Sequence, residues 1–140
     1  MTIGPRMTMM IAISAVAVCA LLAALQRAID VTPTGALVVT LYPPYANEAA
    51  MAWRVQHILP FDSNALGRYP ADDPTVERGN SPVMIYEDGK RLGPAHSNFA
   101  DISRLGHGRF SYWTGQGFVF STSDGSDPNS NGRRYRAVVP

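Results

Sequence analysis

The chain has 140 residues, with 12 Lys or Arg against 11 Asp or Glu and a formal net charge of +1. This balance excludes the strong basic field of a nucleic-acid-binding protein, so no nucleic-acid partner is expected. The one cysteine, Cys19, excludes a disulfide framework. Lys90 is the only lysine, and this preference for Arg is typical of a protein from a GC-rich bacterial genome.

An uncharged apolar run occupies residues 7–25, between Arg6 and Arg27. Its length is close to the ~20 residues that a helix needs to cross the hydrocarbon core of a bilayer. We therefore predict a single transmembrane helix that contacts the lipid bilayer through residues 7–25. A cleaved secretory signal is an alternative that fits the N-terminal position. A lipoprotein signal at Cys19 is another, although Val18 stands where such a signal requires a small residue.

The charges that flank the apolar run are nearly balanced, because Arg27 is partly offset by Asp30. We expect the short N-terminal tail to stay inside and the C-terminal domain to lie on the extracytoplasmic side. The predicted location is the bacterial inner membrane, with a single pass.

Four parts follow one another along the chain: a tail and anchor (1–29), a membrane-proximal strand and helix (30–60), a loop or linker (61–80) and a β-rich C-terminal module (81–140). The β-branched stretch 36–42 predicts a strand, which Pro43-Pro44 should end. Residues 47–59 predict a helix that begins at Asn47, ends at Pro60 and carries one apolar stripe: Met51, Val55, Ile58 and Leu59. The stretch 61–81 shows no period, and a loop this long is either functional or a hinge.

The C-terminal module carries the clearest local signals. Asp88-Gly89 predicts a type I′ hairpin turn with Glu87 opposite Lys90, and residues 98–105 predict two helical turns that end at Gly106. Between residues 109 and 122, a three-residue loop at 115–117 places four aromatic side chains on one face of a hairpin: Phe110, Tyr112, Phe118 and Phe120. Residues 133–139 predict a last strand. The predicted fold class is α+β, an N-terminal single transmembrane helix followed by a small domain of antiparallel β-hairpins with one or two short helices.

The stretch 127–132, DPNSNG, matches the first six positions of an EF-hand loop. The closing acid is absent, since Val138 occupies the twelfth position, and three arginines nearby would repel a cation: Arg133, Arg134 and Arg136. Tight Asx-turns explain the same residues, so neither a metal site nor a cofactor is predicted. The arginines are interpreted as a solvated strand end rather than as a site for phosphates or lipid headgroups.

The three histidines, His57, His96 and His107, show no zinc-binding spacing. His96-Ser97 with Asp101 has the residue types of a hydrolase, but no G-x-S-x-G elbow accompanies them. No catalytic residue is therefore predicted. An enzyme would require one of these histidines to lie beside an acid in a pocket.

A carbohydrate platform is the binding hypothesis that the sequence offers. Trp113 and Tyr112 have flat rings of the kind that stack on a pyranose, and the loop 123–132 is rich in amides and carboxylates that bind hydroxyls. The candidate glycan-binding residues are Trp113, Tyr112, Asp124, Asp127, Asn129 and Asn131. Ordinary core and interface packing is the alternative for the two aromatic residues.

Three segments carry a resemblance: EDGKRLGPAHS (87–97), GHGRFSYW (106–113) and FSTSDGSDPNSNGRRY (120–135). Together they resemble a short β-rich module, about residues 81–136, of bacterial proteins associated with glycosyltransferases and methyltransferases of surface-polysaccharide pathways. The resemblance implies an accessory module near carbohydrate and assigns no site residue.

These observations favour a membrane-anchored, non-enzymatic binding or accessory protein of the bacterial cell envelope, with a glycan or another membrane protein as its partner. One alternative is a structural single-pass subunit of a larger membrane complex, since small residues of the apolar run, such as Ala12, Ser14 and Ala20, allow close helix packing. A small envelope enzyme is the other alternative.

Overall fold

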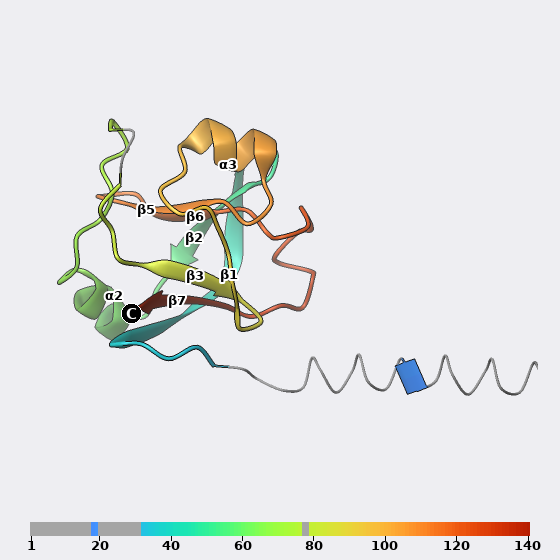
Figure 1. Cartoon of the computed structure of the whole chain (residues 1–140), viewed down its shortest axis with the longest axis horizontal. Helices are drawn as coiled ribbons and strands as arrows, with labels where there is room; N and C mark the ends of the chain where they lie inside the picture. Colours follow the sequence, from blue (N-terminus) through green and yellow to red (C-terminus); the bar gives the residue numbers. More distant parts are fainter. Residues whose placement is uncertain (1–17, 20–31, 77–78) are drawn as a thin grey trace, which may run out of the picture. The chain divides into compact units, whose positions relative to one another are not determined.

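The computed structural model describes residues 18–19, 32–76 and 79–140 (Figure 1). The chain divides into two compact units, residues 1–31 and 32–140. In the first unit only Val18 and Cys19 are described, and both are helical, so the predicted transmembrane helix and its orientation lie outside the described residues. Within the described part, no helix combines the length and apolar character that crossing a bilayer requires.

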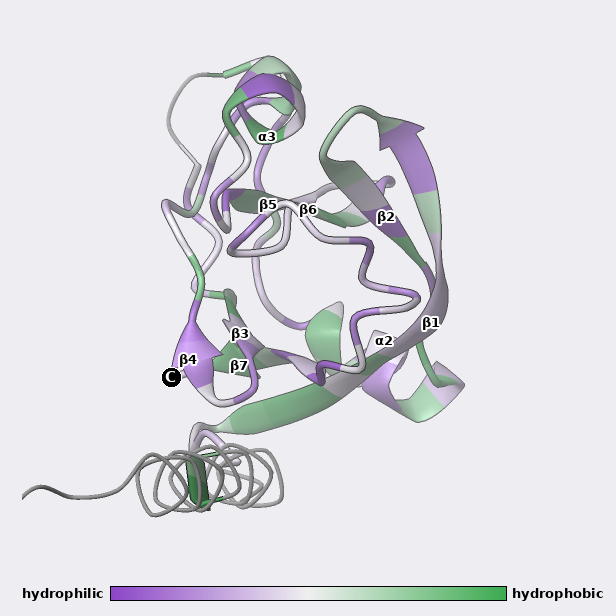
Figure 2. Cartoon of the chain, turned by 90° about the vertical axis from the view of Figure 1, so that its right-hand side faces the viewer, coloured by the Kyte–Doolittle hydropathy of each residue, from purple (hydrophilic) through white to green (hydrophobic). Residues whose placement is uncertain are grey.

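Residues 32–140 form a curled antiparallel sheet of seven strands with two short helices in the described part (Figures 1 and 2). The strand order is β4-β3-β7-β1-β2-β6-β5. This confirms the predicted β-rich domain of antiparallel hairpins, and it brings residues 37–57 and 84–139 into one sheet. The elements are β1 (Leu37–Ala49), β2 (Ala52–His57), α2 (Pro60–Leu66), β3 (Met84–Glu87), β4 (Lys90–Arg91), α3 (Phe99–Leu105), β5 (Phe110–Trp113), β6 (Gly117–Phe120) and β7 (Tyr135–Val139).

Strand β1 connects the two halves of the sheet. Its first part, from Leu37 to Leu41, pairs with β7, and its second part, from Tyr42 onward, pairs with β2. The prediction that Pro43-Pro44 ends the strand is wrong, because the two prolines occupy a register shift between Tyr42 and Tyr45. Proline lacks a backbone N–H and is tolerated at such an irregularity. The strand therefore changes partners at the prolines instead of stopping.

The predicted helix 47–59 is also wrong, because residues 37–57 form a hairpin of β1 and β2. Ala50 adopts a positive φ of 40° in the turn. Strand β2 has a neighbour on each side, pairing Val55 with Tyr45 of β1 and Trp53 with Phe120 of β6. Pairing on both sides overrides the local helical pattern. Pro60, which was expected to end that helix, instead begins α2, where its missing N–H has no cost.

The edge of β5 is covered by loops from elsewhere in the chain. The backbone N–H of Phe110 donates to the Pro94 carbonyl at 3.3 Å, and the Ser97 N–H donates to the Phe110 carbonyl at 3.1 Å. Asp72 forms an isolated parallel bridge with Trp113. The segment after β4 is thus bonded to the strand at the opposite edge, and the sheet curls almost into a barrel (Figure 2).

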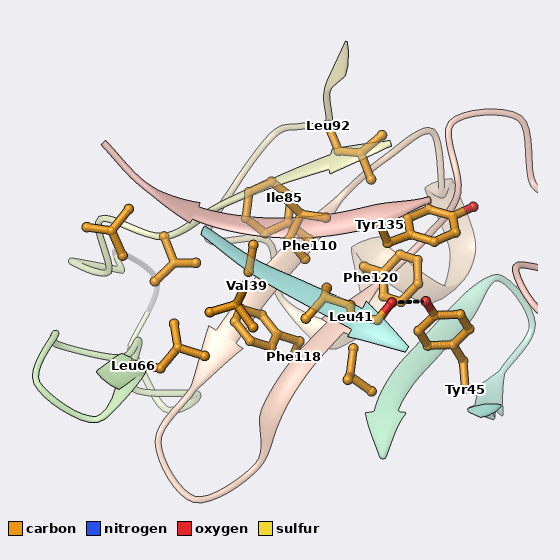
Figure 3. Packing of buried hydrophobic residues seen from close by; sticks show 14 residues of the cluster. Val39, Leu41, Tyr45, Leu66, Ile85, Leu92, Phe110, Phe118, Phe120 and Tyr135 are labelled. Carbon is orange, nitrogen blue, oxygen red and sulfur yellow. Dashed lines mark hydrogen bonds between the residues drawn. The ribbon is translucent and has the colours of Figure 1, made fainter. Parts of the chain in front are cut away.

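Aromatic side chains fill the inside of the curl (Figure 3). Phe110, Phe118 and Phe120 are fully buried, and Tyr112 stacks on Phe118 with ring centroids 4.4 Å apart. The prediction of one aromatic face on this hairpin is confirmed. The loop has three residues as predicted, but it comprises residues 114–116, one position earlier, with Trp113 opposite Gly117.

Other local predictions of the C-terminal module are confirmed. Asp88 and Gly89 turn with positive φ values, and Glu87 pairs with Lys90. Asn98 caps α3 by accepting a hydrogen bond from the Asp101 N–H at 2.9 Å. Helix α3 packs on the outer face of β2 and β6. The contact forms a second apolar cluster that consists of Ala52, Ile102, Trp113 and Val119.

Candidate functional site

A depression of about 430 Å³ opens where the loop after α2, the segment before α3 and the edge of β5 come together. Its lining includes the acidic residues Asp72, Asp73 and Asp101, together with Thr75, His96 and Trp113. This volume lies within the ~300–1,000 Å³ of small-molecule sites.

A buried acid and a histidine lie together in this depression. His96 Nδ1 is 3.0 Å from Oδ1 and 3.0 Å from Oδ2 of Asp72. The Asp72 side chain is 3% exposed, whereas the His96 side chain is 31% exposed. The imidazole therefore contacts a buried carboxylate through Nδ1 and is itself partly exposed, and both residues line the depression.

Backbone hydrogen bonds fix the position of Asp72. Its N–H donates to the Tyr112 carbonyl at 2.7 Å, and its carbonyl accepts from the Thr114 N–H at 3.0 Å, so the residue lies along the edge of β5. Asp72 Oδ1 also accepts from the Ser81 N–H at 2.9 Å. The partners in all three hydrogen bonds are backbone groups, so the carboxylate has little freedom to move.

The histidine and a glycine fit closely around that carboxylate. His96 has a φ of 58°, a conformation that is uncommon outside glycine and that recurs at functional sites. A Cβ on Gly79 would lie 2.2 Å from Asp72 Oδ1 and 2.4 Å from His96 Nδ1. Only glycine fits at that position without moving the pair.

The rim of the depression is acidic. Asp73 Oδ1 accepts hydrogen bonds from the Thr75 hydroxyl at 2.7 Å and from the Thr75 N–H at 2.8 Å, and these bonds lower the pKa of the Asp73 carboxyl. Asp101 Oδ2 accepts from Asn98 Nδ2 at 3.1 Å. None of the described lining residues is Lys or Arg. The carboxylates of the described lining therefore favour hydrogen-bond donors and cations over anions.

Of the residues predicted to bind a glycan, Trp113 lines this depression. It is 6% exposed, because α3 covers the reverse face of β5, and it forms a wall rather than an open platform. Tyr112 points to the opposite face of β5, against Phe118, and burial raises the pKa of its hydroxyl.

The other four predicted residues lie in the loop between β6 and β7, outside the lining of the depression. Asp124 forms an ion pair with Arg133, which holds the pKa of the Asp124 carboxyl well below its usual range. Asp127 Oδ1 accepts from the Asn129 N–H at 2.8 Å, and Asn131 Nδ2 donates to the Tyr135 hydroxyl at 2.8 Å. These side chains therefore bond to other residues of the β6–β7 loop or to the first residue of β7.

Asn129, at the third position of the EF-hand-like stretch, binds backbone. Its Oδ1 accepts from the Tyr45 N–H at 2.8 Å, and its Nδ2 donates to the Tyr45 carbonyl at 3.1 Å. The side chain thereby satisfies the β1 backbone next to the register shift at the prolines. Within residues 32–76 and 79–140, no three His, Cys, Asp or Glu side chains come together in a way that could hold a metal ion.

A second hollow, of about 360 Å³, lies beside the β3–β4 hairpin. Glu87 is opposite Lys90 in the strand register, but its buried carboxylate accepts from the Ser123 N–H at 2.9 Å and contacts Arg133. The guanidinium of Arg133 also binds Asp124. This network ties the β6–β7 loop to the hairpin and is structural.

Sequence reasoning missed the pairing of Asp72 with His96. It grouped His96 with Ser97 and Asp101, but the Ser97 hydroxyl donates to the Pro94 carbonyl at 2.9 Å. Asp101 lines the depression and binds Asn98. The signal in the sequence was the long stretch 61–81, which has no hydrophobic periodicity, since such long loops are often functional. Nothing in that stretch specified a partner for Asp72.

No protein-family model, no curated protein and no solved structure matches this chain. The resemblance of residues 81–136 to a module of surface-polysaccharide proteins therefore stays a prediction.

Proposed function

We propose that this protein is a membrane-anchored binding or accessory protein of the bacterial cell envelope, and that its β-rich domain holds a hydroxyl-rich ligand of the carbohydrate class in the depression around His96. The observation that supports this most is the buried Asp72–His96 pair, which opens into a hollow beside Trp113. In this proposal the apolar run 7–25 keeps the bound ligand at the bilayer surface.

The chemistry of the lining suits hydroxyl groups. The carboxylates of Asp73 and Asp101 at the rim are acceptors for ligand O–H donors, and the exposed side of the His96 imidazole adds a further polar contact. The Trp113 wall supplies apolar surface for the C–H face of a sugar ring. A hollow of about 430 Å³ accommodates one or two sugar units rather than an extended chain.

Binding is tested with the full chain in detergent micelles, first on a glycan array and then by titration calorimetry. We expect Asp101→Asn, at the rim, to weaken binding about tenfold, the effect of a lost hydrogen bond to a charged group. Asp124→Asn is the matched control, because it removes a carboxylate from the β6–β7 loop outside the depression. If only Asp124→Asn weakens binding, the ligand occupies that loop. If the unmodified chain binds no glycan, the proposal is wrong.

A structural subunit of a larger membrane complex is a second candidate, favoured by exposed apolar side chains at the start of α2. Phe61 is 81% exposed and Leu59 is 54% exposed. Purification in mild detergent tests this candidate. A stable partner that Phe61→Ser releases would support it, and a lone monomer would contradict it.

A further inference from the structure

We propose that the depression also performs chemistry: His96 acts as a general base, Asp72 is its positioning residue, and the reaction is hydrolysis of a neutral or cationic acyl ester such as an O-acylated sugar. This inference depends on the proposed function in one respect only, that a ligand enters this depression.

The contact between the two side chains determines which imidazole nitrogen carries the proton. Both Asp72 oxygens lie 3.0 Å from His96 Nδ1, and a carboxylate only accepts hydrogen bonds. Nδ1 therefore carries the proton of the neutral ring, and Nε2 has a free lone pair. Because Asp72 is buried and the ring is part-exposed, the nitrogen on the open side is the basic one. This is the arrangement in which a carboxylate orients a histidine base.

The immediate surroundings of the pair restrict its orientation. His96 adopts a left-handed backbone conformation, and Gly79 leaves no room for a side chain beside either member. The Ser81 N–H binds the same Asp72 oxygen. A merely structural pair could form without a strained histidine or this close approach, whereas a base must be held in one orientation.

The nucleophile is water, because the nearby hydroxyls are engaged. Ser97 Oγ donates to the Pro94 carbonyl at 2.9 Å, and Thr75 Oγ1 donates to Asp73 at 2.7 Å. Water adds to the acyl carbonyl carbon while its proton passes to His96 Nε2. The bond between that carbon and the alcohol oxygen then breaks, and the alkoxide takes the proton back from His96. One ester and one water give one acid and one alcohol, and Asp72 stays ionised throughout.

The charge of the lining selects among esters. Within the described lining, the titratable groups besides His96 are Asp72, Asp73 and Asp101, and none of these lining residues is Lys or Arg. A phosphate or carboxylate-bearing substrate would meet like charge there, whereas a neutral ester would not and a cationic one would be attracted.

Three acetyl esters that differ in charge measure this preference with the full chain in detergent micelles: p-nitrophenyl acetate, acetylcholine and 4-acetoxybenzoate. We expect turnover of the neutral and the cationic ester and much slower turnover of the anionic one. Absence of turnover with all three esters overturns the proposal, and equal or faster turnover of the anionic ester overturns the role of the acidic lining.

Two histidines provide a matched pair of variants. His96→Asn and His107→Asn both replace a left-handed histidine with a residue that tolerates this conformation, but His107 is exposed and lies outside the lining. We expect His96→Asn to lose at least ~100-fold of the ester turnover and His107→Asn to retain it. Equal rates for the two variants overturn the role of His96.

Asp72→Asn tests positioning by a readout that a loss of stability would not produce. Its amide oxygen would stay with the Ser81 N–H, so its NH₂ group would face His96 Nδ1 and force the proton to Nε2. Imidazole ¹⁵N shifts should show the Nδ1–H form in the unmodified chain and the Nε2–H form in the variant. An Nε2–H form in the unmodified chain overturns the proposal. Since neither the shifts nor the acetate probes require glycan binding, failure of the array leaves this proposal standing.

Discussion

Gly79→Ala is the substitution that most directly tests how tightly the Asp72–His96 pair is held. The new Cβ would lie 2.2 Å from Asp72 Oδ1 and 2.4 Å from His96 Nδ1, so at least one of these atoms must move. Asp72 is 2% exposed, and its Oδ1 accepts the Ser81 N–H. Moving the carboxylate would leave that N–H unsatisfied, while moving the imidazole would break the pair.

The expected cost follows from these two effects. Inserting a methyl group into a filled space costs about 1–3 kcal/mol, and weakening one hydrogen bond to a buried charge costs about 1.5–3 kcal/mol. The two costs overlap, because moving either group relieves part of the clash. We expect Gly79→Ala to lower the free energy of unfolding by about 2–4 kcal/mol.

Gly67→Ala is the matched control. A Cβ there would come no closer than 3.5 Å to Ser63 O, and the residue has a φ of −61° that alanine accepts. The control should raise the free energy of unfolding by about 0.4–1 kcal/mol, because alanine lowers the conformational entropy of the unfolded chain. Urea titration of the full chain, followed by tryptophan fluorescence, compares the two variants. Free energies of unfolding of the two variants that agree within ~0.5 kcal/mol would show that the pair accommodates a methyl group and would refute this expectation.

Three further outcomes are expected. Asn129→Ala should cost about 1–3 kcal/mol of unfolding free energy, because the Tyr45 N–H and carbonyl lose their partner; an unchanged urea midpoint would contradict this. Burial raises the pKa of Tyr45 and of Tyr135, so stability present below the ordinary tyrosine pKa of ~10 should be lost as pH rises above it. The part of the tyrosinate absorbance at 295 nm that belongs to the buried Tyr45 and Tyr135 should then appear together with unfolding, and its appearance in the folded chain would argue against this expectation. Arg133 lowers the pKa of Asp124, so the stability from this pair is present above the ordinary aspartate pKa and is lost as pH falls through the lower folded value. Because Asp124 is half exposed, Asp124→Asn should flatten the acid limb of a melting-temperature profile only slightly, and a steeper limb would refute the assignment.

The parts of the fold that the sequence predicts correctly are those where local chemistry decides. Asp88-Gly89 accepts two positive φ values, Asn98 caps a helix, and the spacing of four aromatic residues permits only an odd-length loop on one buried face. Each of these features depends on residues close together in the chain. Their signals therefore need no knowledge of the rest of the structure.

The incorrect and missing parts depend on long-range partners. Residues 47–59 have an apolar spacing that fits a helix, but β6 supplies a neighbour more than sixty residues away and makes residues 52–57 a strand. The prolines at 43 and 44 look like a stop until Asn129 is known to satisfy the backbone beside them. Likewise, Asp72 and His96 are separated by 24 positions, and only the closing of the sheet brings them together.

The loops that form the depression also cover the edge strand β5. Asp72 and the segment 94–97 bond to the backbone of β5, so both bind the edge strand and carry the acid and the histidine. Breaking these backbone hydrogen bonds would therefore also separate Asp72 from His96. A ligand bound to both would stabilise the attachment of the two loops to β5. By mass action, binding of a ligand in the depression and attachment of the loops to β5 stabilise each other. Amide hydrogen exchange at Phe110 and Thr114, whose N–H groups bond to these loops, reports both.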